Sequence, residues 1–292
     1  MALNIRKIVI PYDFSETAAL ALEHAVFMAK FYSAQILLVH VVESRSFTAS
    51  ITSAFTKSDD DAVKDSANQK LKEIADDIHH RSGIKVIFTT QGGTIYKNIV
   101  KLAADEEADI ILMGTHGVSG FQEFFMGSNA YRVVSEAPCP VITVQGHAKR
   151  IGFRNIVLPV DDSHASRQKV PSTCDLAMKY NAVVHIAGLM TDKDELFERK
   201  FRIKVEQVEE YLEKHDVTYT TTYIHGDNLA KMTMEYSNEI NADLVVIMTE
   251  QEPNITGFFL GNYAQQVVNH CKIPVMSIRP AEIDPEKITV TF

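Results

Sequence analysis

The feature that most constrains the fold of this 292-residue chain is an internal repeat. Residues 7–15 read KIVIPYDFS, and residues 155–163 read NIVLPVDDS at a shift of 148 positions. Further on, residues 108–113 (ADIILM) match residues 242–247 (ADLVVI) at a shift of 134 positions. The chain is therefore predicted to contain two copies of one fold, the second being 14 residues shorter between its second and third strands.

Each copy alternates short, continuously apolar runs with longer helical patterns. In the first copy we expect strands at residues 5–11, 35–42, 85–90, 109–113 and 141–144, and helices at residues 15–30, 61–80, 94–107 and 130–134. Continuous apolar runs are typical of strands buried on both faces of a parallel sheet, and such strands need crossover helices. The predicted fold class is α/β, with two tandem Rossmann-like domains, each an open five-stranded parallel sheet with helices on both faces.

A polar junction separates the two copies. Residues 147–150 read HAKR and have glycines on either side, which is typical of a domain boundary. We predict domains at residues 1–148 and 152–281, and a tail at residues 282–292 whose alternating ITVTF ending indicates an added strand. The Ser/Thr-rich residues 43–60 are the extra polar segment of the first copy.

Composition excludes several function classes. The net charge of −9 and the pI near 5.7 argue against a nucleic-acid-binding or anionic-membrane surface, because such surfaces need clustered Lys and Arg. Three cysteines without a CxxC pair indicate a reducing compartment. The N-terminus lacks the apolar core of a signal peptide, and no apolar run is long enough to cross a membrane. The sequence thus predicts a soluble, cytoplasmic protein that binds neither nucleic acid nor membrane.

Glycines gather directly after the apolar run at residues 110–113. Gly114 and Gly117 are separated by two residues in a Gly-x2-Gly pattern. Nine further residues separate Gly117 from Gly127, and Ser128 comes before a helical pattern. Glycine lets backbone N–H groups approach an anion closely, and the helix N-terminus adds unsatisfied donors and a positive dipole end. This arrangement predicts a phosphate site, although the spacing is neither GxGxxG nor the Walker pattern.

These motifs resemble those of a known family. The chain resembles the universal stress protein (UspA) family, in its nucleotide-binding branch, at residues 114–117 (GTHG), 127–128 (GS) and 137–141 (APCPV). The resemblance is strong over residues 5–144 and weaker over residues 152–280, so it indicates the tandem two-domain form. It implies an adenine nucleotide alpha hydrolase-like fold, a role in the stress response, and ATP in the first copy, with or without Mg²⁺.

The resemblance also implies the residues of the nucleotide site, at three strand ends and the glycine loop. They are Pro11, Tyr12, Asp13, Val41, Met113, Gly114, His116, Gly117, Gly127, Ser128 and Asn129. Val41 would form an apolar wall for adenine, and Asp13 would accept from base or ribose or help to hold Mg²⁺. Backbone N–H groups of the loop, from Gly117 to Asn129, would bind the phosphates. Asn129 departs from the small apolar residue that the family usually has after Gly-Ser.

The second copy differs where this chemistry would lie. Gly114, Gly117 and Ser128 correspond to Met248, Gln251 and Asn262 in the second copy. A side chain at the first two positions would crowd the place where the backbone approaches phosphate. We therefore expect the second copy to be a structural partner or to bind a different ligand.

Other interpretations of the same residues stay open. The glycines could be ordinary turn residues, Ser128 an ordinary helix N-cap, and Asp13 a cap for the helix that follows it. His116 could act as a general base, but it more simply orients the backbone, and the loop has no Lys or Arg for transferring phosphate. The leading function is an adenine-nucleotide-binding sensor or regulator with at most weak ATP hydrolysis. The alternatives are a slow ATPase or self-phosphorylating enzyme, and a ligand-free scaffold that binds an unknown protein partner.

Three further features have structural interpretations. Residues 161–164 (DDSH) most simply begin a helix, and Cys139, between two prolines, is more simply packed than reactive. The runs at residues 141–144 and 275–278 would be the last strands of the two sheets. Unpaired terminal strands invite partners, and in the resembling family such strands pair across a dimer. We therefore expect the two copies to form a pseudo-dimer, and a homodimer of chains is a further option.

Overall fold

The computed structural model of the protein describes residues 3–43, 56–115, 126–146, 150–163, 165–249, 251–254 and 257–280. Contacts divide the chain into two compact units. The first unit consists of Asn4–Phe121 and Gly127–Gly146, and the second consists mainly of His147–Phe292. His116, Gly117, most of the Ser/Thr-rich segment and the C-terminal tail lie outside the described residues. The predicted domain bounds, pseudo-dimer and homodimer stay predictions.

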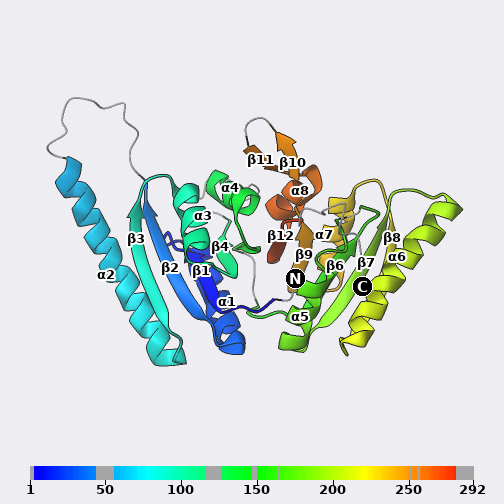
Figure 1. The fold of residues 1–292 in the computed structure, drawn as a ribbon, viewed down its shortest axis with the longest axis horizontal. Helices are drawn as coiled ribbons and strands as arrows, with labels where there is room; N and C mark the ends of the chain where they lie inside the picture. The colour runs from blue at the N-terminus through cyan, green and yellow to red at the C-terminus, as the bar shows by residue number, and fades with distance from the viewer. Residues whose placement is uncertain are drawn as a thin grey trace. The chain divides into compact units, whose positions relative to one another are not determined.

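The first unit has the predicted alternation of strands and helices (Figure 1). Its elements are β1 (Lys7–Pro11), α1 (Glu16–Tyr32), β2 (Gln35–Val42), α2 (Thr56–Ser82), β3 (Val86–Gly92), α3 (Ile95–Asp105), β4 (Ile110–Gly114), α4 (Ser128–Glu136) and β5 (Val141–Val144). The strands are parallel and lie in the order β3-β2-β1-β4-β5. The prediction of an open five-stranded parallel sheet is therefore confirmed.

The second unit repeats this topology. Its elements are β6 (Asn155–Val160), α5 (Val170–Tyr180), β7 (Val183–Met190), α6 (Glu195–Lys214), β8 (Tyr219–His225), α7 (Leu229–Glu239), β9 (Leu244–Met248), α8 (Asn262–His270) and β12 (Val275–Ile278). The parallel order β12-β9-β6-β7-β8 corresponds strand by strand to that of the first unit. An antiparallel pair, β10 (Gln251–Asn254) and β11 (Gly257–Leu260), was not predicted.

Helices cover both faces of each sheet, as predicted. In the first unit the chain runs outward from β1 to β2 and β3, then returns to β4 and continues outward to β5. Because crossovers are right-handed, the helices of connections that run in one direction across the sheet lie on one face, and those of connections that run in the other direction lie on the opposite face. Accordingly α1 contacts α2 on one face, and α3 contacts α4 on the other. None of the helices in the described ranges is both long and apolar enough to span a bilayer.

Burial and capping explain why these segments take these forms. Ile8, Val9 and Ile10 are completely buried in β1, which is the central strand of the first sheet. Each such side chain contributes about 1.5–3 kcal/mol through removal from water. At the start of α1, the Ser15 hydroxyl accepts a hydrogen bond from the Ala18 N–H at 3.1 Å. This confirms the capped helix that the sequence predicts after β1.

An aspartate carboxylate, half-buried in the first unit and buried in the second, joins the start of the central strand to its neighbour. Asp109 Oδ2 accepts hydrogen bonds from the backbone N–H groups of Arg6 at 2.7 Å and Lys7 at 2.9 Å. Asp243 Oδ2 accepts the equivalent pair, from Arg154 and Asn155, both at 3.0 Å. These two aspartates lie in the matched ADIILM and ADLVVI segments, so the repeat preserves a structural contact there.

The prediction that residues 161–164 begin a helix is wrong. Helix α5 begins at Val170, and residues 165–169 form turns before it. Proline has no N–H to donate and fits only the first turn of a helix, so Pro171 forces α5 to begin just before it. The turns bury Lys169, whose Nζ donates to the Ser166 carbonyl and lies 3.3 Å from the Ser166 hydroxyl.

Candidate functional site

The predicted site residues of β1, β2 and β4 meet at the carboxyl edge of the first sheet. Pro11 ends β1 and is followed by Tyr12 and Asp13, Val41 lies at the end of β2, and Met113 and Gly114 end β4. The strand order reverses between β1 and β4, because β1 leads outward to β2 whereas β4 leads outward to β5. Open α/β sheets bind ligands in the crevice at such a switch point. The structure therefore brings these residues to the edge where a ligand would bind.

The N-terminus of α4 adds backbone donors to this edge. Ser128 and Asn129 are the first two residues of the helix, and Gly127 is its N-cap without a side-chain hydrogen bond. N–H groups in the first turn of a helix have no partner within the helix, and they carry the positive end of its dipole. A helix start of this kind can bind an anion, which is the role that the sequence predicts for it. Ser128 lies inside the helix rather than at its cap.

One predicted phosphate donor is already engaged. The Gly127 N–H donates to the Thr115 carbonyl at 2.8 Å, and the Thr115 N–H donates to the Val144 carbonyl at 3.1 Å. This pair of bonds ties the start of α4 to the ends of β4 and β5. In this conformation Gly127 therefore fixes the helix start, and the phosphate donors that remain at this end are those of Ser128 and Asn129.

The turn after β1 holds Asp13 in a fixed position. Asp13 Oδ1 accepts from the Ser15 N–H at 3.1 Å, while Oδ2 has no partner in the part of the chain that the structure describes. The preceding residue is held from both sides, since the Tyr12 N–H donates to the Val39 carbonyl at 2.8 Å and His40 Nδ1 lies 2.8 Å from the Tyr12 carbonyl oxygen. Asp13 can therefore stabilise the turn and still offer one carboxylate oxygen to a ligand.

Gly114 has a physical role that the sequence did not reveal. A Cβ atom at this position would lie 2.7 Å from Thr17 Oγ1 and 2.9 Å from the Thr17 carbonyl carbon. Real Cβ atoms do not approach other atoms so closely. We predicted this glycine from the approach of backbone to phosphate, but here the N-terminal turn of α1 itself requires it.

The corresponding edge of the second unit is built differently. Met248, at the position of Gly114, is buried, and the counterpart of Thr17 is Ala165, which precedes the late start of α5. The β10–β11 pair stands where the first copy has the remainder of its glycine loop, with Gln251 paired to Leu260. Two features are retained. Asp161 Oδ1 accepts from the Ser163 N–H at 2.7 Å, as Asp13 does in the first unit, and Gly261 is the N-cap of α8, as Gly127 is of α4.

A cation near the site was missed by sequence reasoning. Arg132 lies one helical turn after Ser128 on α4, and its Nη1 donates to the Tyr96 hydroxyl of α3 at 3.0 Å. Its guanidinium also lies over the Tyr96 ring, 4.8 Å from the centroid. The i+4 spacing from Ser128 is the signal that could have identified it. Because Tyr96 holds the guanidinium, Arg132 positions α4 against α3.

The described residues hold no metal cluster, and Cys139, which precedes β5 at the opposite edge of the sheet, is not activated as a nucleophile. Among residues 3–280, within the described ranges, no group of three or more His, Cys, Asp and Glu side chains could hold a metal ion. Burial raises the pKa of the Cys139 thiol to about 12, helped by the nearby Asp109 carboxylate. A thiol with that pKa stays protonated at neutral pH and is a poor nucleophile, as its predicted packing role implies. A Mg²⁺ ion would need ATP phosphates beside Asp13 as its ligands.

Comparison with known proteins identifies the family. The sequence profile of the universal stress protein family matches residues 4–145 and again residues 152–279. The chain belongs to the universal stress protein family. Because the two matches are consecutive and cover both copies, it is a tandem member with two family domains.

Individual relatives agree with this assignment. Two universal stress proteins of Methanocaldococcus jannaschii are similar to the chain. One is 31% identical over 140 residues, covering 48% of this chain and 82% of the relative, and the other is 28% identical over 159 residues, covering 50% and 98%. Each relative therefore matches about half of this tandem universal stress protein.

Solved structures agree on the fold. The crystal structure of a universal stress protein from Archaeoglobus fulgidus is similar with a TM-score of 0.75 and 20% identity, covering 94% of this chain and 98% of that one. A Pseudomonas aeruginosa protein of unknown function is similar with a TM-score of 0.69 and 18% identity, covering 94% and 93%. At this level of identity the similarity shows the tandem α/β fold alone.

Proposed function

We propose that this universal stress protein binds ATP, or a related adenine nucleotide, in its first unit and acts in the cytoplasm as a stress-response sensor or regulator. The observation that carries the proposal is the meeting of three strand ends with the N-terminus of α4 at the switch point. The first copy also resembles the nucleotide-binding branch of the family at residues 114–117 and 127–128, and this resemblance supports the same assignment.

Each residue type suits one part of the nucleotide. Val41 would supply an apolar wall for the adenine ring, and backbone groups of Pro11, Tyr12 and Met113 would border it. The open oxygen of Asp13 would accept from a ribose hydroxyl or bind a phosphate-bound Mg²⁺. The N–H groups of Ser128 and Asn129 would donate to phosphate oxygens. We expect His116 and Gly117, outside the described residues, to complete the phosphate loop.

Binding without turnover is the expected activity. Rapid phosphoryl transfer needs a cation at the transferring phosphate and a group that activates the nucleophile. Arg132, the cation described closest along the chain to Ser128, is committed to Tyr96. A slow ATPase or self-phosphorylating enzyme is the runner-up function, and a scaffold that acts through a protein partner without nucleotide is the third.

Calorimetric titration of the full chain with ATP and Mg²⁺ tests the proposal. We expect one site per chain, and we expect Asp13→Asn to weaken binding roughly tenfold or more, since it removes a charge-assisted contact. The asparagine oxygen can still accept from the Ser15 N–H, so the turn is retained. Asp161→Asn changes the same turn of the second unit and is the matched control, which should bind as the natural chain does.

The outcomes separate the three functions. Absence of binding, or equal weakening of binding by the two variants, contradicts the nucleotide site and leaves the ligand-free scaffold as the remaining function. Release of labelled phosphate from ATP that is lost with Asp13→Asn assigns the chain to the slow ATPases instead. A single site that is lost with Asp13→Asn, without release of phosphate, is the result expected of a sensor.

A further inference from the structure

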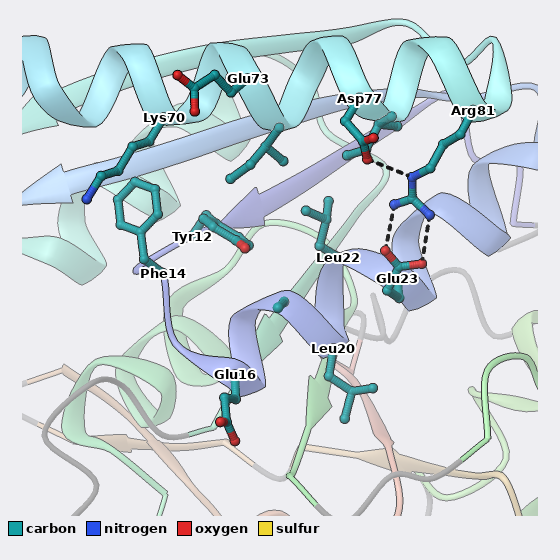
Figure 2. A pocket seen from close by; sticks show the side chains of 13 residues that line it. Tyr12, Phe14, Glu16, Leu20, Leu22, Glu23, Lys70, Glu73, Asp77 and Arg81 are labelled. Carbon is teal, nitrogen blue, oxygen red and sulfur yellow. Dashed lines mark hydrogen bonds and ion pairs between the residues drawn. The ribbon is translucent and has the colours of Figure 1, made fainter.

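A groove runs between α1 and α2 on the face of the first sheet that these helices cover. It has a volume of about 700 Å³, and Figure 2 shows the side chains that line it from both helices and from the turn after β1. The lining residues of α2 are Lys70, Glu73, Ile74, Asp77, Ile78 and Arg81. This i, i+3, i+4 series spans three turns, or about 16 Å. The groove therefore has the length and the spacing that match one face of another helix.

The floor of the groove is apolar. Leu22 of α1 and Ile78 of α2 are buried, and Leu20 and Ile74 are half-buried beside them. An apolar floor between two helices favours an occupant that has an apolar ridge of its own.

Two aromatic rings close one end of the groove. Tyr12 and Phe14 meet edge to face with their centroids 5.3 Å apart, and Lys70 Nζ lies 5.5 Å from the centroid of Phe14. Phe14 has a φ of +64°, a strained conformation for a bulky residue, and the turn holds it there. This end of the groove is therefore rigid, and Lys70 is occupied by the aromatic ring.

The charges along the rim are only partly paired. At the other end, Arg81 donates to both carboxylate oxygens of Glu23, at 2.6 and 3.2 Å, and its Nε lies 3.1 Å from Asp77 (Figure 2). Glu16 of α1 and Glu73 of α2 have no ion pair among the described side chains, and Glu73 accepts only a long bond from Gln69 at 3.4 Å. Two carboxylates, one on each wall, are thus left for cations from outside the unit.

The second unit provides an internal reference for this groove. Three of the four buried positions of α6 coincide with buried positions of α2 at the 134-residue shift, namely Phe201 with Ala67, Val205 with Leu71 and Leu212 with Ile78. Lys70 then corresponds to Lys204, which forms an ion pair with Asp162, the counterpart of Phe14. The two pairs of helices can therefore be compared residue by residue.

In the second unit a guanidinium joins the turns before α5 to α6. Arg167 Nη1 donates to Gln207 Oε1 on α6. Arg167 is the counterpart of Ala19, and Gln207 is the counterpart of Glu73. In the first unit these two positions hold the small, exposed Ala19 and the carboxylate Glu73, and both residues line the groove.

We propose that the α1–α2 groove of the first unit binds a basic amphipathic α-helix of a partner protein. An arginine or lysine of that helix would reach Glu73 in the place that Arg167 takes in the second unit, and a second basic residue would reach Glu16. Apolar residues between them, at helical spacing, would lie on Leu20 and Ile74. This site differs from the nucleotide site, because most of its residues come from the face covered by α1 and α2 rather than from the α4 N-terminus. The two sites share Tyr12, whose ring lines the groove and whose backbone would border the nucleotide.

Selection from a phage-displayed library of helical peptides against the full chain tests the proposal. We expect the enriched peptides to have a leucine-rich ridge flanked by Arg and Lys. Their affinity is then measured by fluorescence anisotropy with fluorescein-labelled synthetic copies. Ala19→Arg introduces the arginine of the second unit at an exposed helical position, so the chain should fold, and peptide affinity should fall at least tenfold. Glu73→Gln should weaken binding about tenfold by removing a charged partner.

Ala104→Arg is the matched control, because Ala104 is exposed on α3, on the opposite face of the same unit, and the change in charge is identical. It should leave peptide binding unchanged, and circular dichroism should show the same helix content for all variants. Enrichment of acidic peptides or of none overturns the proposal, as does equal binding to Ala19→Arg and Ala104→Arg. Displacement of the labelled peptide by agmatine at concentrations near the peptide's own Kd would assign the groove to small organic cations instead.

Discussion

Replacing Gly114 by alanine separates two explanations of the glycine at the end of β4. The new methyl carbon would lie 2.7 Å from Thr17 Oγ1 and 2.9 Å from both the Cβ and the carbonyl carbon of Thr17. Two of these three neighbours are held by the backbone of α1, so the helix start must move to relieve the contact. If the glycine serves only phosphate, the variant would instead be unaffected in the absence of nucleotide.

The expected magnitude follows from two opposing contributions. Forcing an extra carbon into a packed contact costs about 1–3 kcal/mol. Alanine also reduces the backbone freedom of the unfolded chain, which stabilises the folded state by about 0.4–1 kcal/mol. This gain applies here because Gly114 does not have a positive φ, a conformation that alanine would resist. The steric cost is larger, so we expect the first unit to lose roughly 1–2 kcal/mol of stability. For a domain of this size that lowers the Tm by roughly 2–8 °C.

Differential scanning calorimetry without nucleotide measures this loss. Thr17→Ala removes the atom that the new methyl group meets first, so the double variant should recover part of the lost stability. Gly127→Ala is the control from the same loop, because its Cβ would meet only the Thr115 carbonyl oxygen, at 3.3 Å. An unchanged or raised Tm for Gly114→Ala would refute the steric argument, and phosphate binding would then be the only explanation left for this glycine.

Three further predictions concern the rest of the chain. Asp243→Ala leaves the N–H groups of Arg154 and Asn155 without their acceptor, so urea denaturation should show a loss of about 1–3 kcal/mol, and a change under 0.5 kcal/mol would contradict the strand-joining role. Burial lowers the pKa of Lys169 to about 8 from 10.5, so the unfolded chain binds one more proton between these pH values and stability should rise with pH there, by up to roughly 3 kcal/mol. Lys169→Met should lack that rise in pH-dependent urea denaturation, and parallel curves for the two proteins would disprove the assignment. Burial raises the pKa of Cys271 to about 11, so its thiol should resist iodoacetamide at pH 8 in the native protein and react after unfolding, as peptide mass spectrometry would report.

The sequence predicts most of the strands well because they are continuous apolar runs. The bounds expected at residues 35–42, 141–144 and 275–278 are those of β2, β5 and β12. Helix bounds are less exact, and α2 begins five residues before the expected residue 61. Apolar runs end sharply at polar residues, whereas a polar, charged helix start has no such signal.

The errors have specific physical causes. Pro171 fixes the start of α5, and we had placed that start from the Asp-Asp-Ser pattern alone. Pro253 lies within β10. Because proline argues against a strand except at the edge of a sheet, the sequence does not predict the short β10–β11 pair.

The location of the candidate site follows from sequence, but its contacts do not. Spacing placed Gly114 and Ser128 at a strand end and a helix start, since local patterns determine both. Two of these contacts join segments that are far apart in the chain: the packing of Gly114 against Thr17, and the hydrogen bond from Arg132 to the Tyr96 hydroxyl. Such contacts depend on how elements pack, which a single sequence does not display.

The late start of α5 has a consequence for any attempt to make the two units alike. In the first unit the first turn of α1 lies so close to Gly114 that a Cβ atom there would be 2.7 Å from Thr17 Oγ1. In the second unit α5 begins only at Val170, and the residue at the corresponding strand end is the buried Met248. Substituting glycine for Met248 alone would therefore not reproduce the edge of the first unit, because the helical turn that packs against Gly114 would still be missing.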